Sequence, residues 1–172
     1  DATGEHLYEL SWGRDERDVI PDEPDQSISA AETFSYDIDD PETILREYLR
    51  LTEKAAARLR ERELFAKTIS IKVRFSDFET ITRSKTLPLP ISSTQEIYAV
   101  VKDLFKALKL DRARLRLVGV SLENLHTDAP QQLMLGQREK GWREAESAID
   151  RATARFGEKT VRPARLYRRR EK

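Results

Sequence analysis

The chain has 172 residues, 38% of them hydrophobic, and no apolar run near the roughly 18–20 residues that cross a bilayer, so we expect one buried core and no membrane partner. It lacks cysteine, which excludes a disulfide framework or a cysteine metal site and favours a reducing compartment, the cytoplasm. The chain has 31 Lys/Arg and 31 Asp/Glu, so its net charge is zero, but the charges are unevenly distributed. Residues 1–66 hold 8 basic and 18 acidic residues, and residues 67–172 hold 23 basic and 13 acidic residues. This asymmetry suggests that the later part meets an acidic partner.

The first segments of the chain are predicted to lie outside the main domain. Residue 1 is not Met, and we expect the chain to be a piece of a longer protein. Residues 13–26 combine Asp, Glu, Arg and Pro with little apolar content, which is typical of an extended linker. A short strand is predicted over residues 27–36, SISAAETFSY.

Asp40 and Pro41 begin the first predicted core helix, as its cap and its first helical residue. Apolar residues then recur every three or four positions, which predicts a stripe that faces the core. The residues of this stripe are Ile44, Tyr48, Leu51, Ala55 and Leu59.

A β-hairpin is predicted over residues 67–90, KTISIKVRFSDFETITRSKTLPLP. Polar and branched apolar residues alternate from Thr68 to Phe75, which is typical of a half-buried strand. A polar turn at residues 76–77 leads to a return strand over residues 78–86. A slip of one residue in the pairing of this strand exchanges its two faces, so the sequence leaves open which set joins the polar side. The two sets are Thr82, Ser84 and Thr86 on one face, and Arg83 and Lys85 on the other.

A second helix and a further strand complete the predicted domain. Ser93 and Glu96 form a capping box in front of an amphipathic helix. Residues 112–122 alternate arginine with apolar residues, which predicts a strand with a basic face. The order strand, helix, strand, strand, helix, strand favours an α+β fold, in which a four-stranded antiparallel or mixed sheet carries two helices on one face.

The last part of the chain begins with a polar loop that holds an amide followed by spaced apolar residues. Such a pattern suggests a short motif that fills a groove on a partner, and packing of the same residues against the last helix is the alternative. A helix follows at about residues 139–156, with an apolar face and with Gly157 as its stop, before a basic end. The residues of the motif are Gln132, Leu133, Met134 and Leu135.

No catalytic constellation and no Gly-rich phosphate loop is found in the sequence. Asp37, Asp39 and Asp40 form an acidic cluster that could hold a metal ion, but helix capping and loop solubility account for it better. Hydroxyls and cations without an aromatic platform suit contact with the phosphates of a nucleic acid. The cations expected on the open side of the sheet are Lys72, Arg74, Arg114 and Arg116.

Four segments resemble the C-terminal part of the bacterial DNA polymerase IV proteins, which are Y-family translesion polymerases. They are HLYELSWGRD, SISAAETF, KTISIKVRFSDFETITRSKTLP and LRLVGVSL, and they cover most of residues 5–125. The resemblance implies the following division of the chain. The end of a thumb domain spans residues 1–12, a linker 13–29, a DNA-binding little finger domain 30–125, a loop with a clamp-binding motif 126–138, and a C-terminal helix with a basic tail 139–172.

The resemblance also implies what these parts bind. In that family the sheet of the little finger holds the backbone of the primer–template duplex. The resemblance therefore implies contact with the duplex by Thr82, Arg83, Ser84, Lys85 and Thr86, with Arg114 and Arg116 beside them. QLMLG resembles the motif that binds the replication sliding clamp, although Gly136 stands where many relatives have an aromatic residue.

The fingers, the palm and the first part of the thumb of such a polymerase have no counterpart among these 172 residues, nor do the acidic residues that hold its Mg²⁺ ions. The resemblance therefore implies no cofactor and no polymerase activity for the fragment alone. Its partners are expected to be duplex DNA, the sliding clamp and the missing polymerase core. The implied role is DNA repair and damage tolerance by an error-prone enzyme.

Two other functions stay open. A free-standing RNA-binding or assembly module of ferredoxin-like fold would need exposed aromatic residues on central strands for base stacking. Phe75 and Phe78 are the only candidates, and Phe75 belongs to the apolar side of its strand. An unrecognised enzyme would need a pocket with converging ionisable groups.

Overall fold

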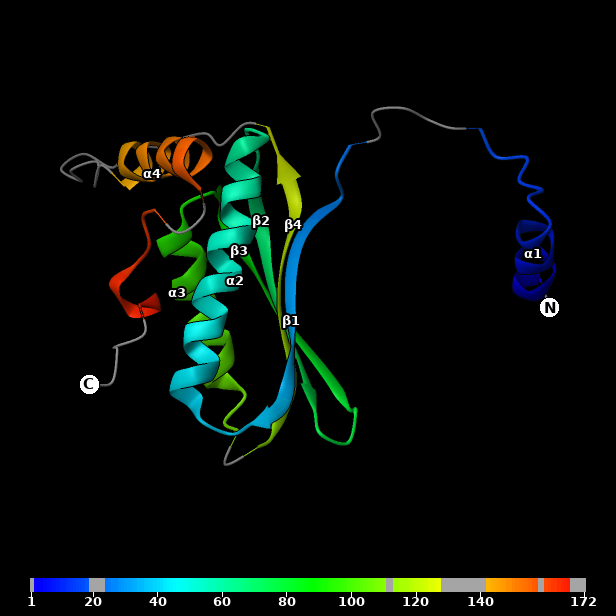
Figure 1. The fold of residues 1–172 in the computed structure, drawn as a ribbon, viewed down its shortest axis with the longest axis horizontal. Coiled ribbons are helices and arrows are strands. Elements are labelled where there is room, and N and C mark those ends of the chain that lie inside the picture. The colour runs from blue at the N-terminus through cyan, green and yellow to red at the C-terminus, as the bar shows by residue number, and fades with distance from the viewer. Residues whose placement is uncertain (1, 19–23, 111–112, 128–141, 158–159, 168–172) are drawn as a thin grey trace.

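The structure is a computed structural model that describes residues 2–18, 24–110, 113–127, 142–157 and 160–167 (Figure 1). No helix in these ranges is both long and apolar enough to cross a membrane. The elements in chain order are α1 (Ala2–Ser11), β1 (Ser27–Ile38), α2 (Pro41–Glu61), β2 (Phe65–Phe75), β3 (Thr80–Ile91), α3 (Thr94–Ala107), β4 (Leu115–His126), α4 (Trp142–Phe156) and the 3₁₀ turn η1 (Ala164–Leu166).

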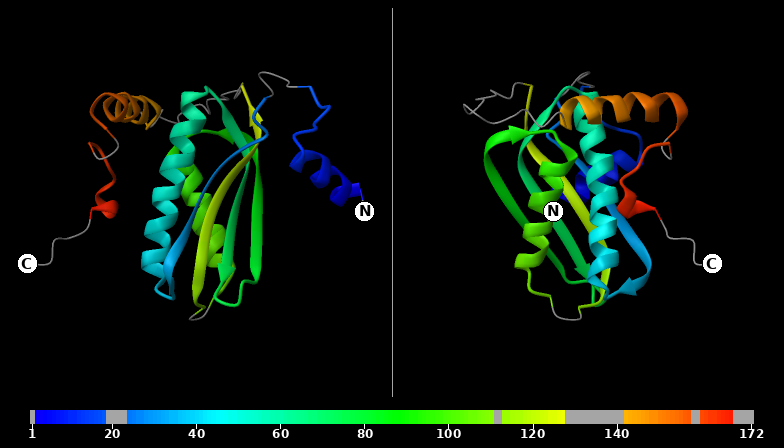
Figure 2. Two further views of the ribbon diagram at one scale, coloured as in Figure 1. Left: turned by 45° about the vertical axis from the view of Figure 1, so that its right-hand side comes forward. Right: turned by 90° about the vertical axis from the view of Figure 1, so that its left-hand side faces the viewer.

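The four strands form one antiparallel sheet in the order β1-β4-β2-β3. Helices α2 and α3 lie together on one face of this sheet, and the described helices leave the other face uncovered (Figure 2). The predicted α+β fold with two helices on one face of a four-stranded sheet is confirmed. The buried apolar side chains of α2, α3 and the sheet form a single core between the two layers.

Helix α2 begins as its sequence predicts. The carboxylate of Asp40 accepts a hydrogen bond from the backbone N–H of Thr43 at 2.8 Å, and Pro41 is the first helical residue. Every residue of the predicted stripe, from Ile44 to Leu59, is buried against the sheet. The helix therefore packs on β1 and β4, and the polar residues of these strands point to the uncovered face.

Helix α3 begins differently from the prediction. Ser93 occupies the cap position, but its side chain makes no capping hydrogen bond, so the predicted capping box is wrong. Glu146 of α4 takes the place of the local cap: its Oε1 accepts from the backbone N–H of Thr94 at 2.9 Å and from the Ser93 hydroxyl at 3.3 Å. A buried carboxylate is a stronger acceptor for these donors than a neutral serine hydroxyl.

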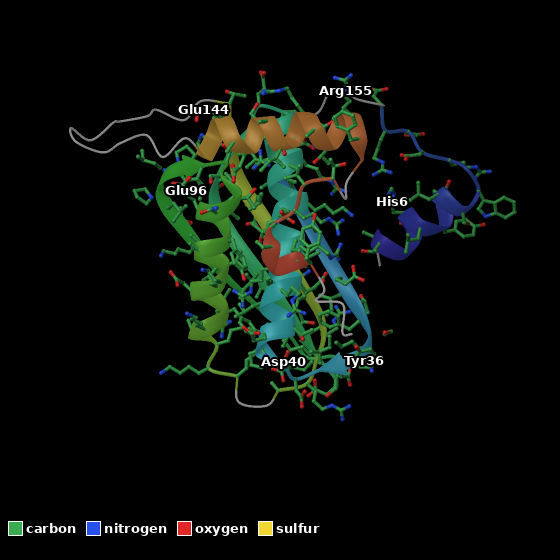
Figure 3. All side chains as sticks on the ribbon, turned by 60° about the vertical axis from the view of Figure 1, so that its left-hand side comes forward. His6, Tyr36, Asp40, Glu96, Glu144 and Arg155 are labelled. Carbon is green, nitrogen blue, oxygen red and sulfur yellow. The ribbon has the colours of Figure 1, made fainter. Side chains whose placement is uncertain are left out.

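Helix α4 packs across the layer of helices through charged residues. Glu144 and Arg155 mark its two ends, far from Tyr36 and Asp40 at the other end of the molecule (Figure 3). Gly157 ends it with φ +94° and donates its N–H to the carbonyl of Thr153 at 2.8 Å, as predicted. The predicted helix start at residue 139 lies outside the described residues.

The predicted apolar face of α4 does not supply its main contact. Ile149 and Phe156 are exposed, whereas Glu146 is only 6% exposed. Arg60 of α2 explains the difference, because its guanidinium pairs with both Glu146 and Asp150. The orientation of α4 is thus set by an ionic contact with α2 instead of by its apolar stripe.

Candidate functional site

The uncovered face of the sheet is the candidate site. Residues directly opposite each other in paired strands share a face, so the register of β2 with its neighbours identifies its members. On β2 the side chains of Thr68, Ser70, Lys72 and Arg74 alternate with the buried Ile69, Ile71 and Val73. The predicted division of this strand into a core side and a polar side is therefore what the structure shows.

The register of β3 answers the question that the sequence left open. Thr82, Ser84 and Thr86 lie opposite Lys72, Ser70 and Thr68. The Oγ1 atoms of Thr68 and Thr86 are 2.9 Å apart, which places both hydroxyls on the uncovered face. The hydroxyl set of the return strand thus belongs to this face.

Arg83 and Lys85 lie on the side of the helices. They are opposite Ile71 and Ile69, which point into the core. Both stay exposed because β3 is the edge strand of the sheet. Cations on an edge strand also discourage pairing with another chain, and Pro88 and Pro90 in the same strand act in the same direction.

Strands β1 and β4 extend the uncovered face with small residues that we did not single out from the sequence. On β1, the alternation of the small polar Ser27 and Ser29 with the apolar Ile28 and Ala30, which are buried, is the sequence pattern that indicates which residues face outward. The members supplied by these strands are Ser27, Ser29, Ala31 and Thr33 on β1, and Leu117, Gly119, Ser121 and Glu123 on β4.

Gly119 makes the middle of this face flat. A Cβ atom at this position would lie 3.3 Å from the Cβ of Ala31 and 3.7 Å from the Cβ of Lys72. A larger residue at position 119 would therefore rise above the two neighbouring strands. Gly119 and the nearby Ser70 are themselves buried, so the exposed side chains of the neighbouring strands form the surface at this point.

The cations Lys72 and Arg74 stand on this flat surface. Lys72 is exposed, and Arg74 is half-buried and donates from its Nε to the hydroxyl of Thr80 on β3 at 3.0 Å. Tyr48, which is fully buried under the sheet, donates its hydroxyl to the backbone carbonyl of Lys72 at 3.2 Å. Burial also raises the pKa of the Tyr48 phenol, so the group stays a donor.

The structure places Arg114 and Arg116 away from Thr82, Ser84 and Thr86, which corrects the arrangement implied above. Strand β2 separates β3 from β4, so neither arginine lies beside these hydroxyls, although Arg116 contacts Phe78 in the turn before β3. Arg116 donates from its Nε to Asp37 Oδ1 at 3.1 Å, and Arg114 lies 4.0 Å from Asp37 Oδ2. The two arginines form a separate cluster at the end of β1 and the start of β4.

Two of the acidic residues considered as metal ligands, Asp37 and Asp40, have structural partners. Asp40 caps α2 and Asp37 pairs with the two arginines. Within the described ranges, no group of three or more His, Asp or Glu side chains could hold a metal ion. The proposed clamp-binding residues Gln132, Leu133, Met134 and Leu135 lie outside the described residues.

Comparisons with known proteins agree with the fold. Residues 25–135 match the family described as "impB/mucB/samB family C-terminal domain". The chain is 36% identical over 126 residues to DNA polymerase IV 2 of Agrobacterium fabrum, which covers 73% of this chain and 35% of that protein. It is 34% identical over 167 residues to DNA polymerase IV of Desulfatibacillum aliphaticivorans, which covers 95% of this chain and 42% of that protein.

Solved structures share the same fold at low sequence identity. The insertion ternary complex of Dbh DNA polymerase superposes with a TM-score of 0.52 at 19% identity, over 74% of this chain and 36% of that chain. DinB from Sulfolobus solfataricus gives a TM-score of 0.52 at 19% identity, over 74% and 37%. The chain thus spans less than half the length of each of these four relatives.

Proposed function

The chain belongs to the impB/mucB/samB family, as the C-terminal, little finger region of a Y-family DNA polymerase, and on this basis we propose that it grips duplex DNA through the phosphate backbone. Such a grip positions a duplex without selecting its sequence. It suits an enzyme that must follow a template past damaged bases.

The observation that carries this proposal is the composition of the uncovered face. Strand pairing places accessible hydroxyl side chains from β1, β3 and β4 on it, together with Lys72 and Arg74, whereas the hydroxyl residues of β2, Thr68 and Ser70, are buried. Hydroxyls and cations are the groups that contact phosphate oxygens. The only acidic member is Glu123, at the end of the face away from Arg74.

The same composition disfavours the RNA-binding alternative. An RNA-binding sheet of that kind stacks bases on aromatic side chains of its central strands. None of the residues that strand pairing assigns to the uncovered face is aromatic. Phe75 lies on the core side, opposite the buried Leu115.

The test measures binding of the chain to a blunt duplex by fluorescence anisotropy over a salt series. Lys72 and Arg74 are the cations on this face, so about two phosphates are contacted and log Kd should change with log salt with a slope of about 2. Lys72→Ala should weaken binding and lower this slope by about one. Lys106→Ala, an exposed cation on α3, is the matched control.

Two outcomes would overturn the phosphate grip. One is an affinity that does not change between low and physiological salt. The other is a Lys106→Ala variant that loses as much affinity as Lys72→Ala. A structured RNA of equal length serves as the competing ligand, and tighter binding to it than to duplex DNA would favour the alternative module.

We also propose that the segment 126–138 binds a sliding clamp. Support comes from the sequence, in which Gln132, Leu133 and Leu135 occupy the recognisable positions of the motif. Gly136 removes the aromatic group that fills the groove in many relatives, so the affinity should be modest. The double variant Gln132→Ala, Leu133→Ala should lose clamp binding and keep duplex binding, and an unchanged clamp affinity would refute the motif.

The whole protein is proposed to be an error-prone translesion polymerase that acts in damage tolerance. By resemblance, its Mg²⁺ ligands belong to a palm domain that lies outside these 172 residues. The described residues do not fit a Mg²⁺ site, because no acidic cluster of three is present among them. No catalytic role is assigned to the chain.

A further inference from the structure

The turn between β2 and β3 holds Phe78 in an unusual backbone conformation. The turn is closed by the N–H of Phe75, which donates to the carbonyl of Glu79 at 2.9 Å, and by the N–H of Phe78, which donates to the carbonyl of Phe75 at 3.1 Å. Phe78 itself has φ +71°. Glycine or asparagine is the usual choice at such a position, and a bulky residue there is strained.

The side chain of Phe78 gains little from the core. It is 62% exposed, although it is a large aromatic group. Its main contact is the guanidinium of Arg116, whose Cζ lies 4.8 Å from the centre of the ring. An exposed aromatic ring on a strained backbone position does not serve folding, and such residues concentrate at binding sites.

Two guanidinium groups, those of Arg114 and Arg116, lie in a cluster on one side of Phe78. Asp37 is the carboxylate that pairs with Arg116 and with Arg114, so one negative charge faces two guanidinium groups. Ser76 is joined to the same cluster, because its N–H donates to the carbonyl of Arg114 at 3.1 Å. The turn itself also carries Asp77 and Glu79 on either side of Phe78, so the aromatic ring, more than a net charge, supplies the main contact of the proposed site.

The turn also continues the proposed duplex-binding face. The hairpin extends past the helices and curls toward the side of the sheet that they leave uncovered (Figure 1). Thr80, two residues after Phe78, accepts the hydrogen bond from Arg74 on that face. A strand of nucleic acid that leaves a duplex on the sheet at this end would pass the turn.

We propose that Phe78 and Arg116 form a binding site for one unpaired nucleotide at the end of the duplex. The free face of the ring stacks on the base, and Arg114 and Arg116 attract its phosphate. Every nucleobase has a π-face, so this contact needs no sequence preference. This nucleotide site adds to the proposed duplex binding and depends on it, since the position of the duplex on the sheet determines where the single strand leaves it.

The experiment compares two DNA ligands with the same duplex, one blunt and one with a single-stranded 5′ overhang, in binding to the full chain by anisotropy. The overhang should tighten binding by about five- to tenfold, which corresponds to the lower end of the affinity gain expected from one base–aromatic stack. Phe78→Ala should remove this preference and leave the blunt affinity unchanged. Phe78→Trp should keep the preference for the overhang, because tryptophan also provides an aromatic ring on which a base can stack.

Phe78→Gly separates a binding role from a folding role. Glycine relieves the backbone strain at φ +71°, so this variant should unfold at a higher urea concentration than the wild type. It should nevertheless lose the overhang preference. If Phe78→Gly or Phe78→Ala keeps the full preference, the nucleotide site is refuted.

The ligands also distinguish this site from the duplex grip. Equal binding of both DNAs by the wild type refutes the nucleotide site and leaves the duplex grip standing. Binding of the overhang ligand alone refutes the duplex grip and supports the nucleotide site. An equal loss of affinity for both ligands in Phe78→Ala assigns Phe78 to the duplex grip and refutes the separate site.

Discussion

The carboxylate of Glu146 accepts a hydrogen bond from the backbone N–H of Thr94 at 2.9 Å, so one helix caps the start of another helix through a residue 52 positions later in the chain. The first N–H groups of a helix have no partner within it and carry a partial positive charge. Glu146 supplies the acceptor and the negative charge from α4. The C-terminal helix is thereby part of the domain's hydrogen bonding.

Arg60 completes this contact from α2. Its Nε lies 2.6 Å from Asp150 and its Nη1 lies 3.4 Å from Glu146. The same guanidinium donates to the carbonyl of Ser92 at 3.1 Å and to the hydroxyl of Thr94 at 3.0 Å. Three helices are thus joined through one largely buried ionic group.

Glu146→Ala should destabilise the domain by about 2 kcal/mol, because it leaves the start of α3 uncapped and Arg60 with one fewer counter-charge. Urea unfolding followed by circular dichroism measures the change. Glu144→Ala, an exposed glutamate in the same helix, should shift stability by less than about 0.5 kcal/mol. Equal effects of the two substitutions would refute the capping role of Glu146.

Arg60→Ala should release α4 from the domain while the sheet stays folded. Hydrogen exchange measures this directly, since the amides of α4 should lose protection and those of β2 and β4 should keep it. The physical reason is that α4 exposes Ile149 and Phe156 and has little apolar contact to replace the ionic one. Arg58→Ala, an exposed arginine of the same helix, should leave α4 protected.

Glu53 should make the domain less stable as pH rises. Burial raises the pKa of its carboxyl to about 7 from the ordinary 4.5, and attraction to Arg162 and Arg60 opposes this only in part. Between these two values the folded chain binds more protons than the unfolded chain, so the free energy of unfolding falls as pH increases through this window. Because Glu53 is partly exposed, the loss should be about 1–2 kcal/mol.

Glu53→Gln measures this contribution, because glutamine cannot ionise. The difference in unfolding free energy between the variant and the wild type should increase in favour of the variant from pH 5 to pH 8. Urea titrations at these two pH values are sufficient. A difference that does not change with pH would show that Glu53 titrates normally in the folded chain.

Charge substitutions on β3 should report which face meets DNA. Ser84→Asp adds a negative charge to the uncovered face and should weaken duplex binding by about tenfold or more, through repulsion of phosphates. Arg83→Gln removes a cation on the opposite face and should cost only about two- to threefold, as a loss of general attraction. A larger effect of Arg83→Gln would mean that DNA approaches the edge of the sheet.

Much of this fold follows from local patterns in the sequence. The period of two in β2, the stripe from Ile44 to Leu59 in α2, the cap at Asp40 and the stop at Gly157 were all predictable. Each depends on residues within a few positions of one another, where backbone geometry and side-chain spacing are enough. The element order then left few sheet arrangements to consider.

The tertiary structure decided which groups meet at the site. It placed Thr82, Ser84 and Thr86 on the uncovered face, a choice that depends on a register no single strand encodes. It moved Arg116 away from them by inserting β2 between β3 and β4. It also replaced the local cap at Ser93 by Glu146, because a buried carboxylate beside Arg60 offers those donors a stronger acceptor than the neighbouring hydroxyl.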